Sequence, residues 1–208
     1  MKFRKNTEMY VYLLLPLLLW PLTFIVFSKY FIYAMALSEL LLISFSLLRF
    51  RKYVPFRKST WKKTAIAGTL GAAVLYAIFL IGYHLALFTG NGAYVTDIYR
   101  MIYAESGKMV IFILLAFIGI AEEIYWRGGI QGIAEKNTRM FRSRPWIAST
   151  AYYACIHLTT LNPILALAAF FVGLVNSLIA QKYGIVASAI SHIAWIEAII
   201  LFLPVISI

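Results

Sequence analysis

Residues 10–28 read YVYLLLPLLLWPLTFIVFS, nineteen consecutive positions without a charged side chain. A helix of about 20 apolar residues is long enough to cross a hydrocarbon core about 30 Å thick. In lipid, only helices and closed barrels satisfy all of their backbone hydrogen bonds, and a barrel strand would alternate apolar with polar residues. This stretch is apolar throughout, so it predicts a membrane-spanning helix.

The composition of the 208-residue chain agrees with this prediction. It is 62% hydrophobic and only 13% charged, whereas soluble domains are roughly half apolar and a quarter charged. A water-soluble globule is therefore excluded. The formal net charge of +11 comes from Lys and Arg in short loops beside apolar runs, where such residues orient membrane proteins. We expect the partner to be a lipid bilayer and not a nucleic acid.

Seven apolar segments follow one another, and the short loops between them leave no room for a soluble domain. They are residues 9–28, 30–48, 64–88, 109–126, 146–161, 163–181 and 185–206, the fifth being short. The sequence thus predicts an all-α, polytopic membrane protein with about seven transmembrane helices. We expect one integral membrane domain, residues 1–208.

The basic residues predict the orientation of this domain. With the N-terminus in the cytoplasm, 15 of the 19 Lys and Arg residues lie on the inner side and three on the outer side, and Arg127 lies near the inner end of the fourth segment. The positive-inside rule favours this arrangement. We expect a multi-pass protein of the cell membrane, or of the endoplasmic reticulum membrane in a eukaryote. The outer loop, residues 90–107, spaces Tyr99, Ile102 and Tyr103 as on a helix, which predicts either an interfacial aromatic anchor or a lid over a substrate site.

The fourth segment contains the strongest functional signal, Ile118-Gly-Ile-Ala-Glu122-Glu123-Ile-Tyr-Trp-Arg127. A charge at mid-bilayer costs at least ~2.5 kcal/mol, so each one needs a partner or a function. Glu123 and Arg127 are i, i+4 neighbours that can pair on one helix face. Glu122 points elsewhere, without a local counter-charge, and is the candidate general base.

Two histidines lie in later segments, His157 in the fifth and His192 in the seventh, with Tyr153 one turn before His157. A single intramembrane histidine is often only a packing residue. Counted from the segment ends at ~1.5 Å per residue, however, both histidines reach a depth similar to that of Glu122. Three helices can therefore bring one carboxylate and two imidazoles together.

These residues resemble a known family. The run Glu122-Glu123-x-x-x-Arg127, an aromatic residue four before His157 and a histidine in the last helix are similar to the CPBP family of CAAX prenyl proteases and bacteriocin-processing proteins, grouped as glutamate intramembrane proteases. The resemblance covers roughly residues 110–200, the expected catalytic core. It implies that Glu122 activates water, that His157 and His192 hold the water or stabilise the oxyanion, and that Arg127 and Glu123 orient the site. The implied substrate is a membrane-associated protein or peptide precursor, cleaved near the cytoplasmic face.

The sequence departs from the family pattern at two places. Tyr153 stands where the family usually has Phe. The Asn or Asp that usually follows the last histidine by three or four residues is absent, since Trp195 and Ile196 occupy those positions. Asn176 and Glu197 are the two candidates to replace it; the alternative for each is a structural hydrogen bond between helices.

Other chemistries are less consistent with the sequence. It has no His-Glu-x-x-His motif, a single aspartate and no Gly-x-Ser-x-Gly motif, which disfavours the usual zinc, aspartyl and serine proteases. We expect no cofactor, although zinc held by Glu122, His157 and His192 is an alternative because two histidines and a carboxylate suit a catalytic zinc ion. The alternative functions are a non-catalytic immunity or scaffold protein of the same family and, less consistent with the sequence, a small proton-coupled transporter. The oligomeric state stays open.

Overall fold

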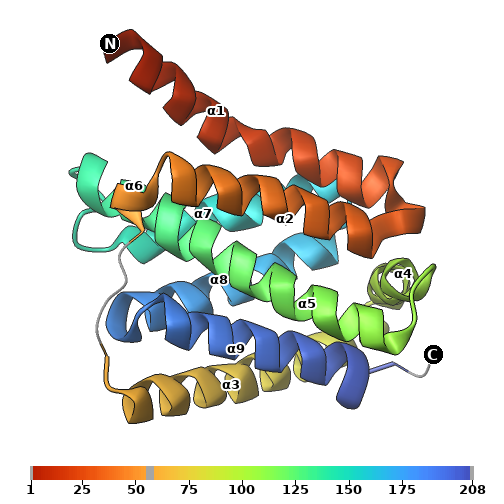
Figure 1. Ribbon diagram of the computed structural model, residues 1–208. Coiled ribbons are helices and arrows are strands. Elements are labelled where there is room, and N and C mark those ends of the chain that lie inside the picture. The colour runs from red at the N-terminus through yellow and green to blue at the C-terminus, as the bar shows by residue number, and fades with distance from the viewer. Residues whose placement is uncertain (1, 55–58, 207–208) are drawn as a thin grey trace.

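The computed structural model describes residues 2–54 and 59–206, and within these ranges it is helical without strands. The α-helices are α1 (Lys2–Pro21), α2 (Phe31–Leu48), α3 (Trp61–Phe88), α4 (Gly92–Tyr103), α5 (Lys108–Glu122), α6 (Gln131–Asn137), α7 (Pro145–His157), α8 (Pro163–Tyr183) and α9 (Ile185–Glu197). Three short π-helical segments, η1 (Leu22–Val26), η4 (Glu123–Ile130) and η6 (Ala198–Phe202), and three 3-10 turns, η2 (Ser28–Tyr30), η3 (Arg51–Tyr53) and η5 (Leu158–Thr160), extend or link them. In Figure 1, α1, α2, α5, α9 and α3 lie one below another, with α7 and α8 behind them.

Six helical segments of the described chain are long and apolar enough to cross a membrane: Thr7–Val26, Ser28–Leu48, Trp61–Phe88, Lys108–Asn137, Pro163–Tyr183 and Ile185–Phe202. The prediction of an all-α, polytopic membrane protein is therefore confirmed, and its count of about seven spans is close. The remaining predicted segment, residues 146–161, corresponds to α7 and η5. These two elements cover about 25 Å, less than a full hydrocarbon core.

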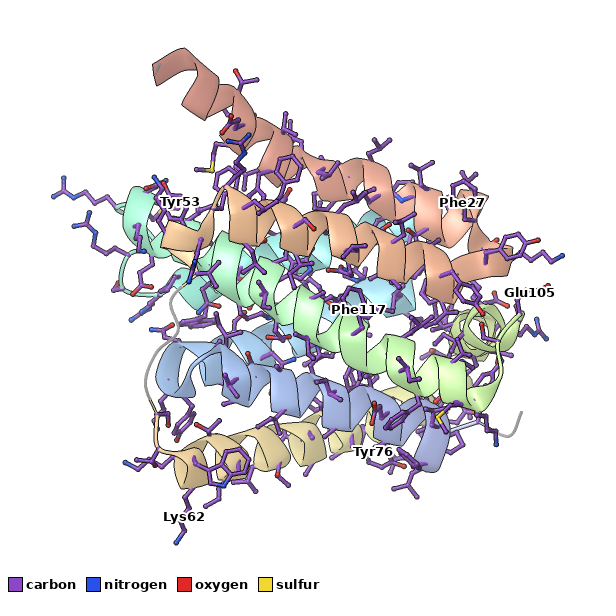
Figure 2. All side chains as sticks on the ribbon, in the orientation of Figure 1. Phe27, Tyr53, Lys62, Tyr76, Glu105 and Phe117 are labelled. Atoms are coloured by element: carbon purple, nitrogen blue, oxygen red, sulfur yellow. The ribbon has the colours of Figure 1, made fainter. Side chains whose placement is uncertain are left out.

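The two ends of the bundle differ in charge. α6 and the start of α3 lie at one end, where Figure 2 shows many nitrogen-tipped side chains and labels Lys62. α4 lies at the other end, next to Glu105 (Figure 2). This separation agrees with the charge asymmetry of the sequence, and the cytoplasmic N-terminus stays a prediction. Arg57 and Lys58, which were counted on the inner side, lie outside the described residues.

The predicted helix in the outer loop is present as α4, and hydrogen bonds join it to η6, the segment that continues α9. The hydroxyl of Tyr99 donates to the Ile199 carbonyl at 2.6 Å, and that of Tyr103 donates to the Ile200 carbonyl at 2.7 Å. Burial raises the pKa of both hydroxyls, that of Tyr99 to about 12, so both remain donors at physiological pH. These bonds hold α4 across the end of the bundle.

Local sequence signals explain how α7, α8 and α9 come side by side. After η5 the chain turns at Leu161, whose φ of 60° is left-handed. Asn162 then caps α8 by accepting the backbone N–H of Leu165 at 2.9 Å, and Pro163 occupies the first turn, where a missing N–H costs nothing. Gly184 ends α8 at φ 92°, a conformation that favours glycine.

A proline within α1 creates a connection to the site helices. Pro16 has no N–H to donate to the carbonyl four residues earlier, that of Tyr12. The buried hydroxyl of Tyr125 donates to this carbonyl at 2.7 Å. The hydroxyl of Tyr152 donates to the neighbouring carbonyl of Leu13. α1 is thus bonded through its backbone to η4 and α7.

Candidate active site

The two glutamates lie where a regular α-helix becomes a π-helix. α5 ends with Glu122, and η4 begins with Glu123. Glu122 is 3% exposed and Glu123 is fully buried. Single π-turns within helices occur frequently at functional sites. The irregular turn therefore coincides with the residues that the sequence singles out.

Glu123 is the most highly connected group of the site. Its Oε1 lies 3.1 Å from Nη1 of Arg127, 2.9 Å from Nδ1 of His192 and 3.2 Å from Nδ2 of Asn176. The guanidinium also donates to the Val172 carbonyl on α8 at 3.1 Å. The predicted pairing of Glu123 with Arg127 is thus present. The pair joins α8 and α9 to η4.

Glu122 has fewer partners. Its Oε2 accepts the hydroxyl of Tyr153 at 2.7 Å and lies 3.7 Å from Nε2 of His192. The side chain lines a large cavity. The guanidinium group of Arg127 stacks on the face of the Tyr153 ring, with its carbon 4.7 Å from the ring centre. The family's usual Phe would lack the hydroxyl that bonds Glu122 here.

The two histidines differ in their contacts. His192 lies between the two carboxylates, with Nδ1 facing Glu123 and Nε2 facing Glu122. His157 reaches this group through Tyr153: its Nδ1 bonds the Tyr153 carbonyl at 2.8 Å, and the two ring centres are 4.4 Å apart. Its Nε2 accepts the indole N–H of Trp20 at 3.2 Å.

A cavity of about 680 Å³ adjoins these groups. Glu122, Tyr153, His157 and His192 supply its polar end, and most of the remaining wall is apolar side chains of α2, α3, α4, α5, α8 and α9. The cavity extends from Glu122 toward α4, away from the end that carries the basic loops. An apolar cavity with a few convergent polar groups is typical of a ligand site.

Three further residues are relevant to the Asn or Asp that the family usually has after its last histidine and that this chain lacks. Asn176 is fully buried and bonds Glu123, so the structure brings it into the site. Glu197 is partly buried and does not line the cavity. Trp195, three residues after His192, does line it, and its enclosed indole N–H has no acceptor among the described residues.

Trp20 was not predicted from the sequence as a residue of the site. It lies in the first apolar run, where a tryptophan is unremarkable, and its partner His157 is 137 positions away. The one sequence feature that pointed to a specific contact was its indole N–H, which at this depth in the membrane finds no acceptor in the lipid. That signal identifies a buried donor but not the group that accepts it.

The donor atoms do not fit the zinc alternative. With its Nδ1 proton on the Tyr153 carbonyl, neutral His157 has one lone pair, on Nε2, and Trp20 occupies it. Catalytic zinc usually has three protein ligands. Within the part of the chain that the structure describes, no group of three or more His, Cys, Asp or Glu side chains is placed to hold a metal ion.

Comparison with known proteins supports the resemblance. Residues 104–196, somewhat less than half of the chain, match the model of the family described as Rce1-like, type II CAAX prenyl endopeptidase. No curated protein and no solved structure matches the chain. The matched segment contains Glu122, Glu123, Arg127, His157 and His192. The similarity to the CAAX protease family is thereby confirmed over residues 104–196, the segment that carries the site.

Proposed function

We propose that this multi-pass membrane protein is an intramembrane endopeptidase in which Glu122 activates the hydrolytic water. The observation that carries the proposal is the position of Glu122 at the polar end of the apolar cavity. One of its carboxylate oxygens accepts the hydroxyl of Tyr153, and the residue lines the cavity. A positioned carboxylate beside a space for substrate has the geometry that a general base needs.

In the proposed reaction, Glu122 takes a proton from water, and the hydroxide attacks the carbonyl carbon of the peptide bond. The oxyanion of the tetrahedral intermediate requires a donor. His192 supplies it when Nε2 is protonated, because Glu123 holds Nδ1 and fixes the ring. Collapse of the intermediate breaks the C–N bond, and the proton on Glu122 passes to the leaving nitrogen. The products are a carboxylate and an amine.

The roles of the other residues follow from their contacts. Arg127 and Glu123 keep η4, α8 and α9 in register, which is the orienting role implied by the resemblance. His157 supports Tyr153 and thereby Glu122, and it assists the reaction through this contact. Asn176 supports the Glu123 carboxylate, so it substitutes for the missing amide as a positioning residue.

The substrate is a membrane-associated protein or peptide precursor. Two predictions differ on the side of the membrane from which the substrate enters the site. The family resemblance places cleavage near the cytoplasmic face, whereas the cavity extends toward α4, which the charge asymmetry assigns to the outer side. The position of the cleaved bond in the substrate distinguishes them.

The test compares the termini of membrane proteins, by mass spectrometry, in host cells that carry the wild type, Glu122→Gln or Glu197→Gln. The second variant is a matched control, because it makes the same change at a partly buried glutamate outside the cavity. New termini are expected with the wild type and the control and not with Glu122→Gln. If all three proteins are folded and equally abundant but give identical termini, the proposal is wrong and the non-catalytic immunity or scaffold function is favoured.

A further inference from the structure

A second concave site lies on the outside of the bundle, between α3 and α8. It is a groove of about 570 Å³. Its walls are mostly apolar and include Ile66, Leu70 and Val74 on α3 and Val175, Leu178 and Ile179 on α8. Lys63, Lys182 and Tyr183 line the same groove. The catalytic groups do not contribute to it.

The length of the groove matches one leaflet of a bilayer. From Lys63 to Val74 the groove follows α3 for eleven residues, about 16 Å at 1.5 Å per residue. Half of a hydrocarbon core is about 15 Å thick. Lys63 is the third residue of α3, and Lys182 is the last but one of α8. The apolar walls therefore lie at the depth of acyl chains, and the two lysines lie at the level of the headgroups.

The two ammonium groups are available to an anion. Neither Lys63 nor Lys182 has an ion-pair partner among the described residues, and the ammonium of Lys182 lies 5.2 Å from the centre of the Tyr183 ring. Basic pockets between transmembrane helices bind the headgroups of anionic lipids. A positive end on an apolar groove one leaflet long is complementary in charge and in shape to such a lipid.

We propose that the groove between α3 and α8 binds one anionic phospholipid, with an acyl chain along the apolar walls and the phosphate at Lys63 and Lys182. A second copy of the chain fits less well. Two copies facing each other through this groove would bring four ammonium groups together, and like charges brought together across an interface are unfavourable.

The test is native mass spectrometry of the purified full-length chain in detergent. Phosphatidylglycerol and phosphatidylcholine with identical acyl chains are added at equal concentrations. The wild type is expected to retain one phosphatidylglycerol in preference to phosphatidylcholine. A lysine near a membrane surface strengthens the binding of an anionic lipid about fivefold, so Lys63→Gln with Lys182→Gln weakens it about 25-fold.

Two further variants distinguish binding in this groove from a general attraction of anionic lipid to a basic protein. The control, Lys62→Gln with Lys108→Gln, removes two exposed charges that do not line the groove, and it is expected to change binding less than twofold. Figure 2 shows Lys62 extending away from the bundle. Leu70→Trp narrows the groove and keeps both lysines, and it is expected to weaken binding about tenfold.

Three results would overturn the proposal. Equal loss of phosphatidylglycerol in the two double variants would mean that total charge is sufficient. Equal retention of phosphatidylcholine by the wild type would mean that the lysines do not select the headgroup. A dimer that forms when lipid is removed, and that Leu70→Trp abolishes, would identify a second copy of the chain as the occupant.

Discussion

Glu123 and its neighbour Glu122 provide a paired test, because the same substitution is expected to destabilise the protein strongly at one position and only slightly at the other. Glu123→Gln removes the carboxylate that lies 3.1 Å from the buried guanidinium of Arg127. Removing one partner of a buried ion pair leaves an uncompensated charge and costs about 3–5 kcal/mol. Glu122→Gln leaves a carbonyl oxygen that still accepts the Tyr153 hydroxyl, so it costs at most about 1 kcal/mol.

Thermal unfolding of the purified protein in detergent, followed by tryptophan fluorescence, measures this difference. For a chain of this length about 1 kcal/mol changes Tm by roughly 2–4 °C. Glu123→Gln is therefore expected to lower Tm by about 6–20 °C, and Glu122→Gln by no more than about 4 °C. Glu122→Gln is nevertheless expected to abolish cleavage, so at this position activity is lost in a protein that remains folded.

A double variant identifies the cause. If the stranded charge of Arg127 is responsible, then Arg127→Met combined with Glu123→Gln is more stable than the sum of the two single changes predicts. The reasoning is refuted if Glu123→Gln unfolds at the same temperature as Glu122→Gln. It is also refuted if the effects of Glu123→Gln and Arg127→Met are additive.

The remaining predictions concern the groups around the carboxylates. Tyr153→Phe removes the hydrogen bond to Glu122 and is expected to lower kcat/KM about 10- to 100-fold, because a bond to a charged group contributes about 1.5–3 kcal/mol; unchanged kinetics would mean that the hydroxyl is dispensable. Trp20→Phe breaks a bond to His157, whereas Trp195→Phe removes a donor without a partner among the described residues; we expect the first to be less stable than the second by about 1 kcal/mol in thermal unfolding, and equal stability would contradict the assigned bond. A chelator such as EDTA is expected to leave cleavage unchanged, because the donor atoms do not fit zinc; inactivation that added zinc reverses would restore the metal hypothesis.

The sequence predicted the features that depend on the spacing of nearby residues or on the requirements of a lipid environment. The apolar runs identified the membrane helices, since lipid admits no other backbone arrangement for them. The i, i+4 spacing predicted the bond between Glu123 and Arg127. Counting residues from the segment ends predicted that His192 lies at the depth of Glu122, and the two side chains are 3.7 Å apart.

Features that depend on contacts between distant segments were not predictable in this way. The sequence assigned Glu122 no counter-charge, yet His192 lies between both glutamates because α9 packs against the end of α5. Trp20 and His157 meet because α1 crosses α7, and the hydrophobic periodicity of the sequence does not predict which helices cross. The direction of the cavity depends on α4, whose position is set by its bonds to η6.

The hydrogen bonds from α1 have a consequence for the modularity of this protein. The segment that the family model recognises begins at residue 104, yet the hydroxyl of Tyr125, that of Tyr152 and Nε2 of His157 all find their partners on α1. If residues 104–196 were expressed alone, these three polar groups would lose their partners in a solvent that offers none. The boundary of recognisable sequence therefore divides a single folding unit, and a chimera that exchanges the N-terminal helices must bring its own donors and acceptors for these three groups.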